Sequence, residues 1–141
     1  MITYQTIRVP MPAIDQAATT AWVEAVAATY GYRVGDIAYI FVDDEEILRV
    51  NRQFLQHDYY TDIITFDNSN HSHFISGDLF ISLDTVRSNA EGLRLSYEQE
   101  LFRVIIHGIL HLCGLNDKGP GEREQMEAAE NRALSMNPLI F

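Results

Sequence analysis

Apolar and polar residues follow two different periods along this chain. Segments in which they alternate, or in which a short apolar run is rich in β-branched and aromatic residues, are typical of strands. Such segments predict strands at residues 2–9, 37–42, 63–67 and 78–82. Segments with apolar residues three and four positions apart predict helices. These segments lie at residues 13–30, 43–54, 83–91, 96–114 and 121–135.

Residues that begin or end regular structure support these boundaries. Gly31 follows the first predicted helix, as expected of a residue that ends one. Ser96, followed three positions later by Gln99, has the capping-box pattern of a helix start, and Gly114 closes the same helix. The polar residues 68–77 separate two predicted strands, so we expect a hairpin with a long loop there.

The mixture of strands and helices places the chain in the α/β class, with α+β character. We expect a single domain over residues 1–141, in which about five helices cover a mixed sheet of about four strands. A chain of this length suits one domain and buries a sizeable core without disulfides. Nearly every residue at positions 101–112 is apolar, which predicts a central buried helix.

Composition restricts the compartment and the partners of the protein. The net charge of −10 argues against indiscriminate nucleic-acid binding, although it allows a local basic cleft. Cys113 is the single cysteine, which excludes an internal disulfide and favours a reducing cytoplasm. The first residues lack the pattern of a signal peptide, and the apolar runs are too short to span a bilayer. We therefore expect a cytoplasmic protein without a membrane partner.

The central helix carries a stripe of polar residues on one side. Glu100, Arg103, His107 and His111 are spaced three or four apart, so a helix places them on one face. A buried imidazole nitrogen without a partner costs about 1–3 kcal/mol, and a shared metal ion would satisfy both histidines. The i, i+4 spacing places their Cβ atoms about 5–6 Å apart, which suits tetrahedral zinc.

Asp117 is the candidate for a third metal ligand. Gly114 allows the chain to turn back after the helix, and a carboxylate oxygen is an established zinc ligand. Two histidines and one carboxylate would leave one position open, as in catalytic zinc sites. The zincin motif HExxH has a glutamate beside its first histidine, whereas this chain has Gly108, which counts against zincin-type peptidase chemistry.

The run HGILHLCGLND at residues 107–117 resembles the hallmark HGxLHLxGYDH of the YbeY family, also called UPF0054. Upstream residues resemble the family segment N-x-x-[YF]-R-x-x-D-x-x-T-[DN]-V-L-S-F and the G-D-I that follows it. The matching positions are Asn51, Phe54, Asp58, Thr61, Asp62, residues 63–66 and residues 77–82. Further matches toward the C-terminus are Glu100, Met126 and Glu130. The resemblance covers most of the chain.

The chain departs from the family pattern at the third ligand and at an arginine. Asn116 and Asp117 stand where the family has aspartate and histidine, and a carboxylate in place of imidazole retains metal binding. Leu55 stands where the family has an arginine. The residues that could supply the missing positive charge are Arg103, Arg52 and His57.

The resemblance implies a zinc-dependent endoribonuclease that is directed to single strands and holds one zinc per chain. It implies action in late 16S rRNA 3′-end maturation and in ribosome quality control, with ribosomal RNA and the small ribosomal subunit as partners. One alternative is a non-catalytic ribosome-assembly factor with a structural zinc. The other is a metal-dependent hydrolase of a different substrate, such as a peptide. We expect a monomer.

Several further residues are candidates for the cleft around the metal. They lie near strand ends or on the polar stripe of the central helix. These residues are Asp62, Thr65, Asp78 and Glu100. His71 and His73 form an HxH pair in the polar loop, where a solvated loop is favoured over a second metal site.

Overall fold

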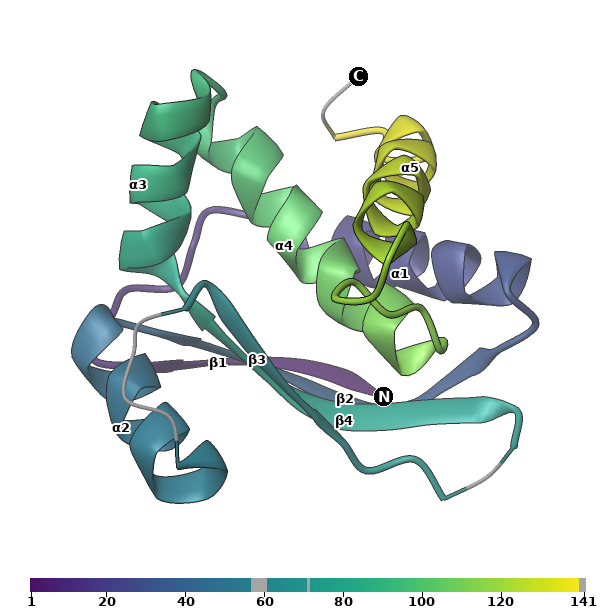
Figure 1. The fold of residues 1–141 in the computed structure, drawn as a ribbon, viewed down its shortest axis with the longest axis horizontal. Helices are drawn as coiled ribbons and strands as arrows, with labels where there is room; N and C mark the ends of the chain where they lie inside the picture. Colours follow the sequence, from purple (N-terminus) through teal and green to yellow (C-terminus); the bar gives the residue numbers. More distant parts are fainter. Residues whose placement is uncertain (57–60, 71, 140–141) are drawn as a thin grey trace.

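The computed structural model describes residues 1–56, 61–70 and 72–139, which form four strands and five helices (Figure 1). The strands are β1 (Ile2–Ile7), β2 (Arg33–Val42), β3 (Ile63–Asp67) and β4 (Phe74–Ser82). The helices are α1 (Gln16–Thr29), α2 (Asp44–Leu55), α3 (Leu83–Leu93), α4 (Tyr97–Leu112) and α5 (Glu122–Ser135). The predicted class is confirmed.

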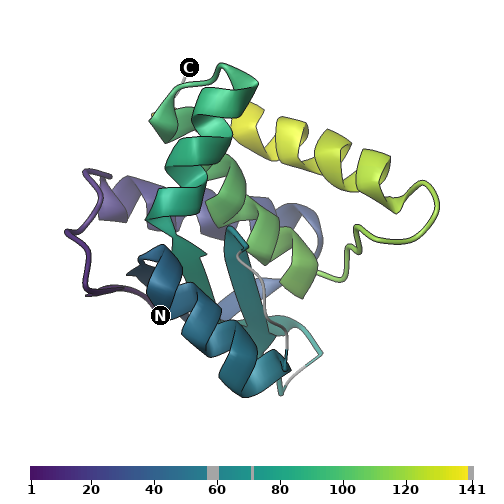
Figure 2. The same ribbon diagram turned by 60° about the vertical axis from the view of Figure 1, so that its left-hand side comes forward.

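The four strands form one mixed sheet in the order β1-β2-β4-β3. Strand β2 is parallel to both β1 and β4. Strand β3 runs antiparallel to β4, which confirms the predicted hairpin. Helix α2 covers one face of the sheet, and the other four helices gather on the opposite face (Figures 1 and 2). This arrangement gives the protein a large core on the four-helix face and a smaller one beneath α2.

Alternating residues of the central strands contribute to the two cores. In β2, Tyr39 and Phe41 belong to the large core, whereas Ile40 and Val42 pack toward α2. Successive strand residues point to opposite faces, so a strand covered on both faces is apolar almost throughout. This explains why the segment lacks a clean alternation of apolar and polar residues.

Helix α4 runs through the middle of the large core. Ser96 and Gln99 form the predicted capping box at its start. The hydroxyl of the buried Tyr39 donates a 2.9 Å hydrogen bond to the carbonyl of Ile105, which ties the helix to the sheet. Contacts reach α4 from α1, α3, α5, β3 and β4, so the helix that carries the histidines is held from several directions.

Gly108 allows α4 to lie close to the sheet. A Cβ atom added there would overlap the Cδ2 atom of Leu79 and lie 3.0 Å from Cδ1 of Ile63. The hydroxyl of Thr65 would be 3.4 Å away. Glycine beside His107 is therefore a packing requirement of the fold, and a glutamate there would collide with β3 and β4.

The first strand and first helix are shorter than their sequence pattern predicts. Strand β1 ends at Ile7 because Arg8 takes a left-handed conformation with φ of 63°. Helix α1 starts at Gln16, where the Asp15 carboxylate accepts a hydrogen bond from the backbone of Ala18. A cap residue lies outside the helix it begins, so the predicted start at residue 13 is too early.

Two strands are longer than predicted, because their pairing extends beyond the apolar runs. Strand β2 begins at Arg33, which pairs with Phe74 of β4. Strand β4 correspondingly starts at Phe74, and Gly77 within it pairs with Asp67 of β3. Residues 74–77 therefore belong to the sheet and not to the predicted loop.

Candidate metal centre

His107, His111 and Asp117 lie together at the C-terminal end of α4. One ligand atom from each lies within 4.8 Å of the others. The Nε2 atom of His107 is 3.3 Å from Oδ2 of Asp117, and the Nε2 atom of His111 is 3.7 Å from Oδ1. Two imidazole nitrogens and a carboxylate oxygen are a donor set that suits zinc, so these side chains fit the predicted metal.

The turn after α4 brings Asp117 back to the two histidines. Gly114 has φ of 98°, and its N–H donates to the carbonyl of His111 at 3.0 Å. The N–H of Leu115 donates to the carbonyl of Leu110 at 3.1 Å. This pair of bonds is the Schellman motif, in which a residue of positive φ reverses the chain at a helix end. The residues after Gly114 therefore run back along the face of α4 that carries the two histidines.

Glu130 of α5 contacts His107 on the side away from Asp117. Its Oε2 atom lies 2.6 Å from Nδ1 of His107. Its Oε1 atom accepts a 3.0 Å hydrogen bond from the guanidinium of Arg103. A carboxylate on the second nitrogen of a ligating histidine fixes its tautomer and ring orientation. Glu130 thus directs the Nε2 atom of His107 toward the candidate metal position.

The surroundings of His107 favour its protonated form when no metal is bound. Burial lowers the pKa of His107. The hydrogen bond and charge of Glu130, with the charges of Asp117 and Asp62, outweigh that effect and raise the pKa above its ordinary value. Because only the neutral imidazole is a ligand, a metal competes with protonation of His107. The same negative charges attract a cation to the site.

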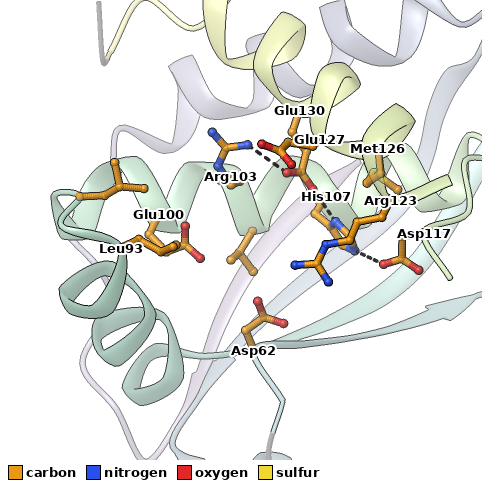
Figure 3. A pocket seen from close by; sticks show the side chains of 12 residues that line it. Asp62, Leu93, Glu100, Arg103, His107, Asp117, Arg123, Met126, Glu127 and Glu130 are labelled. Carbon is orange, nitrogen blue, oxygen red and sulfur yellow. Dashed lines mark hydrogen bonds and ion pairs between the residues drawn. The ribbon is translucent and has the colours of Figure 1, made fainter. Parts of the chain in front are cut away.

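Two cavities meet at the candidate metal ligands. The first has a volume of about 480 Å³ and lies between α4, α5 and the chain before β3 (Figure 3). The second has a volume of about 390 Å³ and reaches toward the end of α2. The residues that line both cavities are Asp62, His107 and Asp117. A substrate in either cavity would lie beside the metal ligands.

Three of the four predicted cleft residues lie at these cavities. Glu100 lines the first cavity, Thr65 lines the second, and Asp62 lines both. Asp78 is outside them: in β4 it alternates with Leu79, which faces α4, and it accepts a 3.3 Å hydrogen bond from Asn68. The structure does not bring Asp78 to these cavities, because the strand turns this residue to the α2 face.

The candidate cations differ in their positions. Arg103 lines the first cavity, but its guanidinium donates to Glu130 and Asn131. Arg52 is absent from the described lining of either cavity. His57 lies outside the described residues. Leu55, at the family's arginine position, lines the second cavity, so the departure from the family falls on a wall of the site.

Arg123, Lys118 and Glu130 were not predicted as site residues from the sequence. Arg123 lines the first cavity and Lys118 the second, while Glu130 contacts His107. A signal for Glu130 exists, because it lies among buried α5 residues that include Met126 and Ala133. A carboxylate in such an apolar stripe needs a partner. No comparable signal marks Arg123 or Lys118, since both are exposed.

Other candidate features lie away from this centre. His73 is exposed, and His71 of the predicted HxH pair is outside the described residues. Cys113 is buried as predicted, and burial raises the pKa of its thiol to about 11. Across the described residues, each helix is too short or too polar to cross a membrane.

Comparisons with known proteins agree with the sequence motif. Residues 3–137 match the protein family described as Endoribonuclease YbeY. A protein of that name from Phocaeicola vulgatus is 69% identical over 139 residues, covering 99% of this chain and 100% of the relative. Another from Bacteroides fragilis is 67% identical over 135 residues and covers 96% of each chain.

A solved structure shares the fold. The solution structure of a Thermotoga maritima protein covers 96% of this chain and 90% of its own, with a TM-score of 0.64 and 24% identity. At this level of identity the likeness concerns the fold alone. The same arrangement of strands and helices therefore occurs in a protein of low sequence identity.

Proposed function

This chain belongs to the YbeY endoribonuclease family, and we propose that it uses zinc to cleave single-stranded RNA in 16S rRNA 3′-end maturation and ribosome quality control. The endoribonuclease role follows from family membership, as does an RNA substrate. The ligands we propose for zinc are His107, His111 and Asp117. Their convergence within 4.8 Å, on the segment that carries the family motif, is the observation that supports the proposal.

A zinc ion on these three residues would supply Lewis acidity that activates water and offsets charge on a phosphate. Other residues of the chain orient these ligands. Glu130 accepts the Nδ1 proton of His107 and so presents Nε2. Arg103 holds Glu130 through a 3.0 Å hydrogen bond from the other side. This series of contacts fixes one ligand before substrate arrives.

Arg123 is the residue we propose to contact an RNA phosphate. It lines the first cavity, and Figure 3 shows its guanidinium directed between His107 and Asp62. Within the described part of the chain it has no ion pair, whereas Arg103 is engaged by Glu130. A guanidinium free to form two parallel hydrogen bonds suits a phosphate group. Arg123 would supply the positive charge that Leu55 cannot.

The exposure of the three ligands favours catalysis over a structural zinc. Structural zinc sites are usually closed by four protein ligands. Here the side chains are 20% exposed at His107, 34% at His111 and 25% at Asp117, and both cavities open onto them. A peptidase of the zincin type is disfavoured, because the close packing of Gly108 excludes a general base at that position.

The wider setting follows from the same proposal. The small ribosomal subunit is the proposed partner, and the protein would act on it as a monomer in the cytoplasm. The net charge of −10 makes recognition through a long basic surface unsuitable. We therefore expect binding to depend on the cleft and on partner contacts.

The test is zinc content together with cleavage of an RNA that carries the 16S 3′ precursor sequence. Purified wild-type protein should contain one zinc per chain and cut this RNA, while His111→Ala and Asp117→Ala should lose both properties. Asn116→Ala, an exposed neighbour, is the matched control and should retain both. Zinc-loaded protein that joins the small subunit without cutting RNA would instead support the assembly-factor alternative.

A further inference from the structure

Glu100 is a buried carboxyl group that the proposed zinc site does not use. It is 4% exposed and lies in the first turn of α4, where it lines the first cavity. Its Oε1 atom has no hydrogen-bond partner among the described residues. An isolated buried charge is strongly unfavourable, so this group favours its neutral form unless a cation in the cavity stabilises the carboxylate.

The nearest arginine on the same helix does not fill this role. Arg103 lies one turn beyond Glu100, but it directs one terminal nitrogen to Glu130 and the other to Asn131, each at 3.0 Å. Its charge still lowers the pKa of Glu100, but burial and the charges of Asp62 and Glu130 outweigh it and raise that pKa. Glu100 therefore lies in a locally negative region.

Asp62 is the second carboxylate that faces this space. It precedes β3 and lines the same cavity as Glu100. Figure 3 shows the carboxyl group of Glu100 entering from α4 and that of Asp62 entering from the opposite wall. Burial raises the pKa of Asp62 even though the charge of His107 acts to lower it. The two groups come from distant parts of the sequence and converge on one space.

Carboxylates outnumber cationic side chains in the lining of the first cavity. Its lining contains five carboxylates against two arginines and one histidine. Glu130 is paired with Arg103, and Asp117 belongs to the zinc ligands. This leaves Asp62, Glu100 and the exposed Glu127 with Arg123 as their only remaining positive neighbour among the described lining residues.

We propose that Asp62 and Glu100 hold a second, hard divalent cation, Mg²⁺ or Mn²⁺, in the cavity beside the zinc ligands. Two carboxylates with water completing the coordination are the usual protein contribution to a Mg²⁺ site. The donors are oxygen only, unlike the imidazoles of the zinc site, so the two positions select different metals. The cavity of about 480 Å³ has room for the hydrated ion.

The cation would face an RNA phosphate bound along the same cavity. Mg²⁺ is commonly shared between protein carboxylates and substrate phosphates. It would also add positive charge near the metal ligands, in a chain that has Leu55 at the family's arginine position. This role in cleavage rests on the proposed function, whereas the binding of the cation does not.

Titration of the zinc-loaded protein with Mn²⁺, followed by the electron paramagnetic resonance signal of free Mn²⁺, tests the site directly. Wild-type protein should bind one Mn²⁺ beyond its zinc. Glu100→Gln and Asp62→Asn should each weaken this binding at least tenfold while zinc content stays at one per chain. Glu98→Gln, an exposed residue of the same helix turn, is the matched control and should bind as wild type does.

Absence of Mn²⁺ binding to folded, zinc-loaded wild type would overturn the second site. Binding as tight as that of wild type in both Glu100→Gln and Asp62→Asn would overturn it as well. Circular dichroism shows whether a variant has failed to fold. If one variant does not fold, Mn²⁺ binding by the other variant decides whether the site exists. RNA cleavage is measured separately: protein that binds Mn²⁺ but never cuts RNA refutes the proposed function and leaves the cation site standing.

Discussion

The Nδ1 atom of His107 lies 2.6 Å from Oε2 of Glu130, although the two residues are on different helices. The contact joins α4 to α5 at the point where His107 presents its other nitrogen to Asp117, 3.3 Å away. One imidazole is thus held between two carboxylates. The packing of α5 against α4 therefore helps to hold His107 in its ligand position.

Substitution of Glu130 should weaken zinc binding without removing a ligand. In Glu130→Gln the negative charge on the Nδ1 side of His107 is lost, and loss of such an outer partner typically costs 10–100-fold in metal affinity. Competition with a chromophoric chelator measures the zinc dissociation constant. Glu124→Gln, exposed in the first turn of α5, serves as control. An unchanged constant in Glu130→Gln would show that the contact does not support the metal.

Gly108→Ala should destabilise the protein despite the better helix propensity of alanine. The propensity gain is about 1 kcal/mol, whereas overpacking a core costs typically about 1–3 kcal/mol. We expect a net loss of up to about 2 kcal/mol in the free energy of unfolding, measured in urea, because the added methyl overlaps Leu79. Gly92→Ala in α3 meets nothing within 4 Å and should be neutral or stabilising. Equal behaviour of the two variants would contradict the packing account.

Glu100 should make the metal-free protein less stable as the pH rises. Burial and the charge of Asp62 raise its pKa above the ordinary value of 4.5, so the folded protein binds the proton more tightly than the unfolded chain. The resulting stability is complete below pH 4.5 and is lost as the pH rises through the raised pKa. Glu100→Gln removes this loss.

Urea unfolding of chelator-treated protein between pH 4 and pH 7 (about the range in which carboxyl groups titrate) measures the effect. We expect Glu100→Gln to be more stable than wild type at the upper end of the range, with the difference shrinking toward the lower end. Glu98→Gln controls for the loss of one surface charge. A constant difference across the range would argue against titration of Glu100.

Arg123→Gln should weaken RNA binding more than it slows the chemical step. Loss of a hydrogen bond to a charged group costs about 1.5–3 kcal/mol, and the exposed position of Arg123 favours the lower figure, roughly tenfold in KM. Steady-state cleavage kinetics separate KM from kcat. Arg132→Gln changes the same charge near the far end of α5, outside the described cavity lining, and should leave KM unchanged. A wild-type KM in Arg123→Gln would exclude the proposed phosphate contact.

The sequence by itself determined the parts of the protein that depend on local spacing. His107 and His111 are four apart in an apolar helix, and Gly114 reverses the chain so that Asp117 returns within one turn. All three ligands lie within eleven residues, so helix geometry and one turn suffice to bring them together. The four strands and five helices follow from hydrophobic periodicity in the same way, with errors confined to their ends.

Tertiary structure alone decided what surrounds the ligands. Glu130 and Arg123 reach the metal centre because α5 packs on α4. The spacing of apolar residues along each helix does not determine how the two helices pack against each other. The pairing of β3 with β4 places Asp62 at the cavities, while the pleat of β4 turns Asp78 away from them. Spacing along one element specifies neighbours on that element, whereas contacts between elements depend on packing of the whole core.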